Sequence, residues 1–191
     1  MKIPTKVINF LTKNKVPYEV ALHRTVYTAY DLAQTMKKEL DKVLKTLVVK
    51  ADKSYVLVVV PASYRLDLPA LKKMLKAKVI KIEKEQIMPK LFKVKAGAIS
   101  PWHGPLHNMP VYVDKAVLKT QRALVQAGSF EESLHIKTRD LLKSVAGQIG
   151  SFAKKHHFVK VTKSKAVRPK AKKLAKAKSV KKSVKSKKSR R

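Results

Sequence analysis

The order of apolar and polar positions predicts helices and strands that alternate along the first part of the chain. Apolar residues recur at helical spacing over Ile3–Leu11, which predicts a first helix. Alternation over Val16–Leu22 favours a strand. Thr28 precedes a second run of residues with helical spacing, which ends near residue 38. Asp31 stands three residues after Thr28. This spacing is a variant of the capping box, so we expect Thr28 to cap the second helix.

The middle of the chain carries its strongest strand signal. The segments Val43–Ala51 and Ser54–Pro61 are both rich in β-branched residues, and only Asp52-Lys53 separates them. Two such runs with a short polar connection predict a β-hairpin. Val56–Val60 is apolar without interruption, which is typical of a strand that is buried on both faces.

Shorter elements follow the hairpin, and they fix the predicted fold class. The predicted helices are one over Pro69–Leu75 that is capped by Asp67, one at Glu83–Leu91, and one that is capped by Thr138 and runs through Val145. The predicted strands are Val79–Ile82, Val111–Val113, Ala123–Ala127 and Ser133–Ile136. We expect the stretch Trp102–Met109 to be irregular. Several connections are too short to contain a helical crossover. The pattern therefore predicts an α+β fold with a mixed, mostly antiparallel sheet and packed helices.

Composition narrows the class of protein. The chain has 191 residues, 45% of them hydrophobic, which allows one domain with a sizeable core and an appendage. It has no cysteine, which excludes disulfides, a thiolate nucleophile and a zinc–thiolate site, and suits the cytoplasm. No apolar run approaches the ~18 residues that span a bilayer. The first eleven residues lack the apolar region of a signal peptide, so export by that route is not expected.

Charge divides the chain into two parts. The formal net charge is +33, and residues 160–191 contain 16 Lys and Arg with no Asp or Glu, which leaves +17 for residues 1–159. We predict a domain over residues 1–158 and a basic tail over residues 159–191, disordered because it has too few apolar residues to form a core. Such charge favours a polyanionic partner, with nucleic acid ahead of a membrane surface. No amphipathic helix with bulky apolar anchors accompanies the tail, which argues against the membrane.

Two features suggest chemistry. The segment Gly97-Ala98-Ile99-Ser100-Pro101 combines a residue with free backbone angles and one that removes a donor, so it predicts a shaped loop whose N–H groups can face a ligand. Such N–H groups can hold a carbonyl oxygen or a developing oxyanion. Lys45 stands at the start of the first hairpin strand. Spacing and composition alone favour the simpler interpretations, an ordinary turn for the loop and an ordinary surface charge for Lys45.

A collinear series of motifs resembles the YbaK-type aminoacyl-tRNA deacylases, a domain that also occurs as the editing insertion of bacterial prolyl-tRNA synthetases. The series runs through Tyr18-Glu19-Val20, His23, Thr28-Ala29, Lys45–Lys50, Val58–Ala62, Arg65–Asp67, Gly97–Pro101, Val111–Asp114 and Ala127–Ser129. The resemblance covers about Met1 to Phe152. It implies a curled, barrel-like mixed sheet ringed by helices, and hydrolysis of the ester in mischarged aminoacyl-tRNA.

The resemblance also implies a site. Lys45 would hold a terminal phosphate or the ester carbonyl, and Gly97, Ala98 and Ile99 would position the carbonyl as catalytic groups of the loop. The substrate-binding residues that it implies are Tyr18, His23, Thr28, Ser100, Pro101, Asp114 and Ser129. The family often has glycine where His103 stands, which leaves the register of the loop open.

Several of these residues have simpler interpretations. Thr28 is explained as a helix cap, Tyr18 by packing in the core, and Asp114 as a turn or cap residue. His23 either orients substrate or satisfies a buried polar contact. Ser100 and Ser129 have no evident base, and no Ser-His-Asp set is recognisable. His103 and His107 flank Gly-Pro rather than sharing a helix face, so we predict no metal site, and no cofactor is implied.

The residues leave the partner partly open. The expected partner is tRNA, with an aminoacyl-tRNA synthetase or the ribosome as further candidates. Alanyl, cysteinyl, seryl and threonyl esters are all substrates that the resemblance allows. The alternative function is a non-catalytic protein that binds RNA or DNA through the same scaffold, with the basic tail binding phosphates. The sequence does not indicate an oligomeric state.

Overall fold

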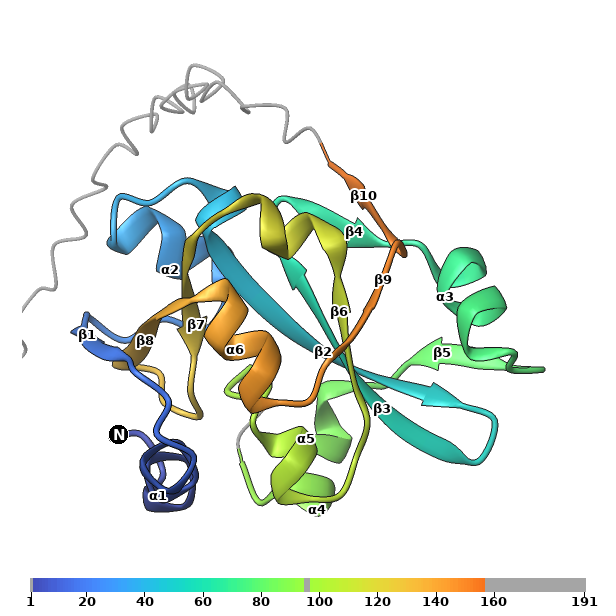
Figure 1. Cartoon of the computed structure of the whole chain (residues 1–191), viewed down its shortest axis with the longest axis horizontal. Helices are drawn as coiled ribbons and strands as arrows, with labels where there is room; N and C mark the ends of the chain where they lie inside the picture. The colour runs from blue at the N-terminus through green and yellow to red at the C-terminus, as the bar shows by residue number, and fades with distance from the viewer. Residues whose placement is uncertain (1, 95–96, 157–191) are drawn as a thin grey trace, which may run out of the picture. The chain divides into compact units, whose positions relative to one another are not determined.

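A long antiparallel hairpin organises the fold in the computed structural model, which describes residues 2–94 and 97–156. Its strands are β2 (Val43–Ala51) and β3 (Ser54–Pro61), paired from Leu44 opposite Pro61 to Ala51 opposite Ser54 (Figure 1). The hairpin predicted from the sequence is confirmed with its bounds. Val58, Val59 and Val60 are fully buried and divide between two core clusters, so β3 is buried on both faces as its composition predicted.

The main sheet is mixed. Besides the hairpin, its strands are β1 (Glu19–Leu22), β5 (Ile80–Ile82), β6 (Val111–Asp114), β7 (Arg122–Gln126), β8 (Glu132–Lys137) and β9 (Gln148–Gly150). The strand order is β1-β8-β7-β2-β3-β6-β9, and β5 also pairs with β2. The pairs β2–β7, β3–β6 and β6–β9 are parallel and the other pairs are antiparallel. The predicted α+β class with a mostly antiparallel sheet is confirmed.

The sheet is open over the described part of the chain. Its order begins at β1 and ends at β9, and these two strands do not pair with each other. The barrel-like form implied by the family resemblance is therefore not confirmed. A separate two-stranded sheet joins β4 (Tyr64–Leu66) to β10 (Ala153–Lys155).

One edge of β2 is interrupted. On the side away from β3, β7 pairs with Val43 and Leu44, and β5 pairs with residues 49–51. The backbone N–H of Glu83 also donates to the carbonyl oxygen of Val48 at 2.9 Å. The three residues 45–47 therefore face an opening between β7 and β5.

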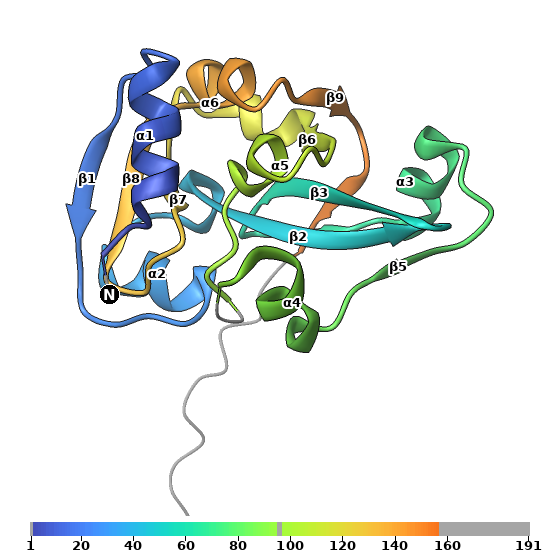
Figure 2. The ribbon, with the colours of Figure 1, turned by 90° about the horizontal axis from the view of Figure 1, so that it is seen from below.

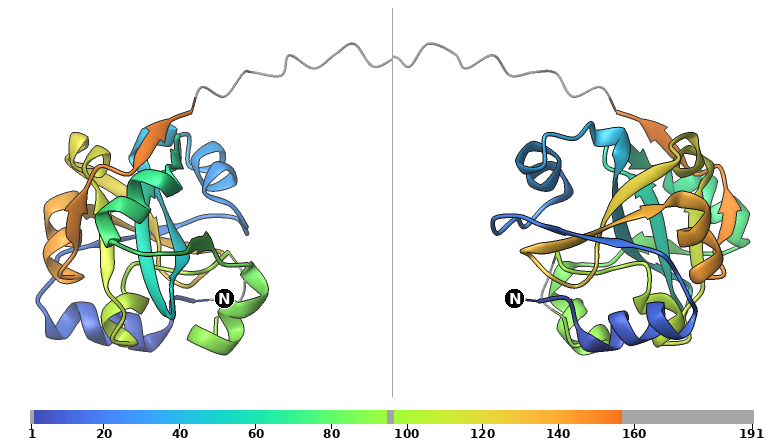
Figure 3. Two further views of the ribbon diagram at one scale, coloured as in Figure 1. Left: turned by 90° about the vertical axis from the view of Figure 1, so that its right-hand side faces the viewer. Right: turned by 60° about the vertical axis from the view of Figure 1, so that its left-hand side comes forward.

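Short helices surround the sheet, with α2 near one end and α1 near the other (Figure 3). They are α1 (Thr5–Lys13), α2 (Ala29–Thr35), α3 (Leu68–Leu75), α4 (Met88–Phe92), α5 (His103–Leu106) and α6 (Thr138–Ser144), with 3-10 turns η1 (Leu40–Lys42), η2 (Glu85–Ile87) and η3 (Lys115–Lys119). Figure 2 shows α3 beside the far end of the hairpin, next to β5. None of the helices described is long and apolar enough to cross a membrane.

Most predicted caps are confirmed, but two local expectations were wrong. Thr28 accepts from the N–H of Asp31, and Asp67 accepts from the N–H of Ala70. Thr138 is instead the first residue inside α6, and its hydroxyl donates to the carbonyl of Thr120 at 2.7 Å. Helix α5 occupies the stretch expected to be irregular, because tight packing at Gly104 fixes this short turn. The Gly-Pro pair therefore does not separate His103 from His107 as expected, and their rings stack with centroids 6.1 Å apart. The predicted boundary after residue 158 and the basic tail lie outside the described residues.

Candidate functional site

A pocket of about 220 Å³ lies at the interrupted edge of β2. The chain segments that meet there are far apart in sequence, and the lining residues are Tyr27, Thr28, Ala29, Lys45, Thr46, Leu47, Val48, Ile82, Glu83, Glu85, Met88, Gly97 and Ile99. Alternate residues of a strand point their backbone groups to the same edge. Because Val48 bonds to Glu83 at this edge, the N–H and C=O of Thr46 point into the opening.

Lys45 brings a partly buried positive charge to this pocket. Its Nζ donates to the carbonyl oxygen of Ala62 at 3.3 Å, and it forms no ion pair with any described residue. Burial lowers the pKa of the Lys45 amine, and the nearby charge of Arg65 lowers it further. An anionic or strongly polarised ligand would restore the lost solvation, so the side chain is suited to bind one.

The Gly97–Pro101 loop enters the pocket through Gly97 and Ile99. Gly97 has φ +83°, and a Cβ there would lie 2.8 Å from the carbonyl oxygen of Tyr27. Glycine is therefore required twice, for the left-handed backbone and for the close approach to the chain at Tyr27. Ala98 and Pro101 are buried behind the pocket rather than lining it.

A buried imidazole holds the loop from behind. Nδ1 of His103 lies 2.7 Å from Oγ of Ser100 and accepts from the Ser100 N–H at 3.1 Å. Burial lowers the pKa of His103 to about 4. The ring is therefore neutral at physiological pH, which leaves Nδ1 free to accept both hydrogen bonds. Ser100 thus has an imidazole neighbour that sequence reasoning missed, but the exposed fraction of Ser100 is 0% and it does not line the pocket.

Of the predicted site residues, the structure brings Lys45, Thr28, Gly97 and Ile99 to one pocket. Thr28 also caps α2, because its Oγ1 accepts from the Asp31 N–H at 3.0 Å and donates to the Asp31 carboxylate at 2.8 Å. Thr28 is therefore a helix cap that also lines the pocket.

Four other predicted residues lie outside this pocket. Tyr18 packs against the core, and Nε2 of His23 lies 2.8 Å from Oγ of Ser133. The carboxylate of Asp114 accepts from the N–H groups of Ala116 and Phe152, and Oγ of Ser129 accepts from the N–H groups of Glu131 and Glu132. These contacts shape turns and strand ends, as the simpler interpretation of Asp114 predicted.

Sequence reasoning missed several groups around the pocket. Tyr27 is 65% exposed at the rim, with its ring centroid 5.1 Å from that of Phe130. Glu83 and Glu85 bring carboxylates, and the hydrogen bond from Lys81 is the main cause that lowers the pKa of Glu83. Only the pairing of β5 with β2 places Glu83 here, so no local pattern marked it.

Gln126 is a further missed residue. It is only 7% exposed, and its Nε2 has no hydrogen-bond partner among the described residues. Leu44 pairs with Val125, so Gln126 and Lys45 are the next residues of two neighbouring parallel strands. Register-matched neighbours point to the same face of a sheet, so the amide lies on the face that carries Lys45. A single polar residue in the apolar run Ala-Leu-Val-Gln-Ala was the available signal.

Comparison with known proteins gives one family match. The model of the aminoacyl-tRNA editing domain matches residues 23–144, which include Lys45, the Gly97–Pro101 loop and Gln126. No curated protein sequence matches the chain. Among the described residues, no three His, Cys, Asp or Glu side chains gather as a metal site would require.

Solved structures share the fold at low sequence identity. "Hypothetical protein APE2540" has a TM-score of 0.72 and 16% identity, over 78% of this chain and 99% of that chain. A "putative trans-editing enzyme for prolyl tRNA synthetase" has a TM-score of 0.70 and 20% identity, over 78% of this chain and 96% of that chain. A protein of Marinobacter aquaeolei named for signal transduction has a TM-score of 0.61 and 19% identity, over 80% and 31%. Because differently named proteins share this fold, function must be argued from the site.

Proposed function

Since the chain belongs to the aminoacyl-tRNA editing domain family, we propose that it is a trans-editing hydrolase of the YbaK type that cleaves the ester of mischarged aminoacyl-tRNA. The observation that carries the proposal is the meeting of Lys45 with the Gly97–Pro101 loop at one pocket. These two elements are separated by more than fifty residues, and the opening in the sheet gives both of them access to one ligand.

The reaction needs positive charge and N–H donors rather than a covalent intermediate. A water oxygen bonds to the aminoacyl carbonyl carbon, and the negative charge that develops on the carbonyl oxygen is stabilised by the Lys45 ammonium and backbone N–H groups. The carbon–oxygen bond to the ribose then breaks, and the ribose oxygen takes up the proton that the attacking water has lost to its base, which leaves a ribose hydroxyl and a free amino acid. The base that activates water is either a second water or the neighbouring ribose hydroxyl.

The pocket favours a small aminoacyl group. Its volume of about 220 Å³ is below the ~300 Å³ at which drug-sized ligands begin to fit, so it would admit an amino acid ester but not the adenosine beside it. Alanyl, cysteinyl, seryl and threonyl esters are the substrates to test first. The terminal adenosine would lie at the mouth, where Tyr27 offers an exposed ring for stacking.

The proposed partner is tRNA in the cytoplasm, delivered free or by a synthetase or the ribosome. The excess of 17 positive charges in residues 1–159 supports a polyanionic partner. The same charge supports the second candidate function, a non-catalytic protein that binds RNA or DNA. The two differ in whether bound aminoacyl-tRNA is hydrolysed.

The deciding experiment measures deacylation of tRNAs carrying each of the four amino acids, by wild type and Lys45→Ala. Lys13→Ala, which removes an exposed lysine at the end of α1, is the matched control. We expect selective hydrolysis that falls about 10²- to 10³-fold in Lys45→Ala and not in the control. Equal activity of Lys45→Ala would overturn the site, whereas retention of RNA without hydrolysis by wild type would favour the second function.

A further inference from the structure

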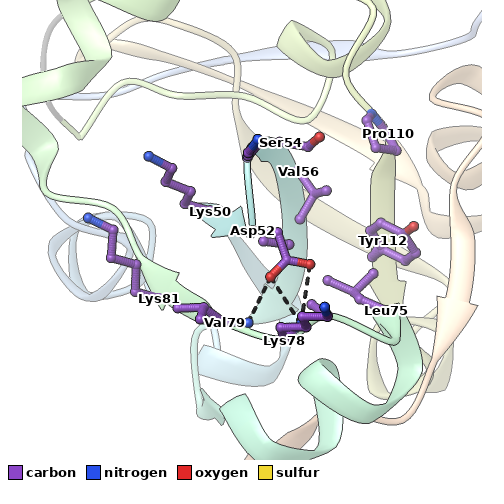
Figure 4. A pocket seen from close by; sticks show the side chains of 13 residues that line it. Lys50, Asp52, Ser54, Val56, Leu75, Lys78, Val79, Lys81, Pro110 and Tyr112 are labelled. Carbon is purple, nitrogen blue, oxygen red and sulfur yellow. Dashed lines mark hydrogen bonds between the residues drawn. The ribbon is translucent and has the colours of Figure 1, made fainter.

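A second, larger pocket lies at the far end of the hairpin, and it is lined by four lysines: Lys50, Lys53, Lys78 and Lys81 (Figure 4). We call it the lysine pocket. We propose that it binds backbone phosphates of the acceptor strand of tRNA, a few nucleotides from the ester. This inference rests on the proposed function, because it assumes that the aminoacyl end occupies the pocket at Lys45.

The lysine pocket is built from three segments of the chain. Its volume is about 980 Å³, and the lysines come from the hairpin, from the connection after α3 and from β5. In Figure 4 the side chains of Lys50 and Lys81 extend beside each other, and Asp52 points toward the backbone at Lys78 and Val79. The volume is sufficient for a phosphate group with its ribose.

The carboxylate of Asp52 accepts hydrogen bonds from backbone N–H groups. It accepts from the N–H of Val79 at 2.8 Å and from the N–H of Lys78 at 3.0 and 3.2 Å. These two backbone hydrogen bonds are the main causes that lower the pKa of Asp52. Asp52 thereby anchors the segment that carries Lys78, and it forms no ion pair with a lysine amine of the pocket.

The positive charges of the lysine pocket lie close together and are mostly unpaired among the described residues. Lys50 and Lys81 stand directly opposite each other in the β2–β5 pair, where like charges destabilise a sheet. Lys81 pairs with Glu83 at 3.1 Å, and the Nζ of Lys50 lies 5.7 Å from the ring centroid of Tyr55. In the described parts of the chain no ion pair involves Lys50, Lys53 or Lys78. A polyanion that contacts the amines of Lys50 and Lys81 would relieve this repulsion.

The distance from the candidate site fits a nucleic acid strand. Lys50 follows Lys45 by five residues of β2, which corresponds to about 16 Å along a strand. Because phosphates repeat every few ångströms along a nucleic acid strand, this distance spans several nucleotides. Segment 79–83 connects the two sites directly, since Val79 and Lys81 line the lysine pocket and Glu83 lines the other.

The test compares Lys50→Gln/Lys78→Gln with the control Lys13→Gln/Lys115→Gln, which removes two exposed lysines from α1 and η3. Binding of uncharged tRNA is measured from 50 to 200 mM salt. Each phosphate contact contributes a slope of about 0.7 to 0.9 in log K against log salt. We therefore expect wild type and the control to lose about tenfold more affinity over this range than Lys50→Gln/Lys78→Gln.

A kinetic measurement locates the effect on the substrate. With a cognate aminoacyl-tRNA, we expect Lys50→Gln/Lys78→Gln to raise KM about tenfold and to leave kcat unchanged. With an aminoacyl-adenosine, which has no backbone phosphate, we expect both constants to equal those of wild type. An equal rise of KM for the two substrates would overturn the proposal, because it would indicate a distorted active site.

The outcomes separate the two proposals. If wild type hydrolyses no ester but the salt slope still falls in Lys50→Gln/Lys78→Gln alone, the proposed function fails and the phosphate site stands. If the salt slope is the same in this variant and in the control, the phosphate site is wrong, whatever the activity.

Discussion

Nδ1 of His103 lies 2.7 Å from Oγ of Ser100, and both side chains are buried. The imidazole holds the Gly97–Pro101 loop through its hydrogen bonds with Ser100. Because Nδ1 must be unprotonated to accept the N–H of Ser100, protonation of His103 would replace this hydrogen bond by one donated to the Ser100 carbonyl oxygen, 3.3 Å away. The loop is thus linked to pH although no titratable group of the loop itself is involved.

We expect stability to decrease in mild acid because of His103. Its pKa is about 4 in the folded chain and about 6.5 when unfolded, so the unfolded state binds more protons between these values. The contribution is fully present above pH 6.5 and is lost as pH falls toward 4, by about 3 kcal/mol. Urea unfolding at pH 7 and pH 4.5 checks this.

The matched variants for that experiment are His103→Gln and His107→Gln. Burial also lowers the pKa of His107, so it contributes in the same direction. We expect His103→Gln to reduce the pH dependence more than His107→Gln does. A larger reduction in His107→Gln would contradict the assignment.

Gly97→Ala should damage both folding and activity. The substitution places Cβ 2.8 Å from the carbonyl oxygen of Tyr27 and requires alanine at φ +83°. We expect a loss of about 1–2 kcal/mol in the free energy of unfolding. We also expect a loss of up to about 10²-fold in kcat/KM for deacylation, because the loop must move. Full activity in the variant would show that the position of the loop does not matter.

Gln126→Leu should separate stability from activity. Leucine has a similar size and removes a buried amide nitrogen that has no partner among the described residues, so the free energy of unfolding should rise by about 1 kcal/mol. Because Gln126 neighbours Lys45, we expect kcat/KM to fall in the same variant. Thermal unfolding and deacylation of the same preparation provide the check. Lower stability would indicate that the amide is satisfied in solution.

Deletion of residues 160–191 should weaken tRNA binding and flatten its salt dependence. Sixteen positive charges are removed with no negative ones, and the salt slope falls by about 0.7 to 0.9 for each phosphate that these charges neutralise in the full chain. We expect kcat for deacylation to be kept. An unchanged salt slope in the truncated chain would exclude the tail from RNA binding.

Local patterns predicted much of the fold. The hairpin of β2 and β3 and the caps at Thr28 and Asp67 each depend on a few adjacent residues, and all are confirmed. The parallel pairs β2–β7 and β3–β6 join segments that lie more than fifty residues apart, and no local pattern fixes such a register.

The candidate site likewise combines residues that the sequence marked with residues that only long-range strand pairing brings there. Lys45 and Gly97 could be singled out because a family resemblance marked them, and they line one pocket. Glu83 lines the pocket because β5 pairs with β2, and Gln126 neighbours Lys45 because β7 pairs with β2. Asp114 was expected to bind substrate, but its side chain accepts two backbone N–H groups at strand ends. A buried polar residue can match a motif and still have a structural role.

The opening at residues 45–47 also bears on aggregation. A strand with a free edge can recruit strands from other chains, and proteins usually block such edges with charge or covering segments. Here the free edge is three residues long and paired strands close it at both ends. Since strands usually run to about five or six residues, another strand cannot dock there, whereas a small ester can. At this opening the backbone groups are thus accessible to a small ligand but not to a strand of another chain.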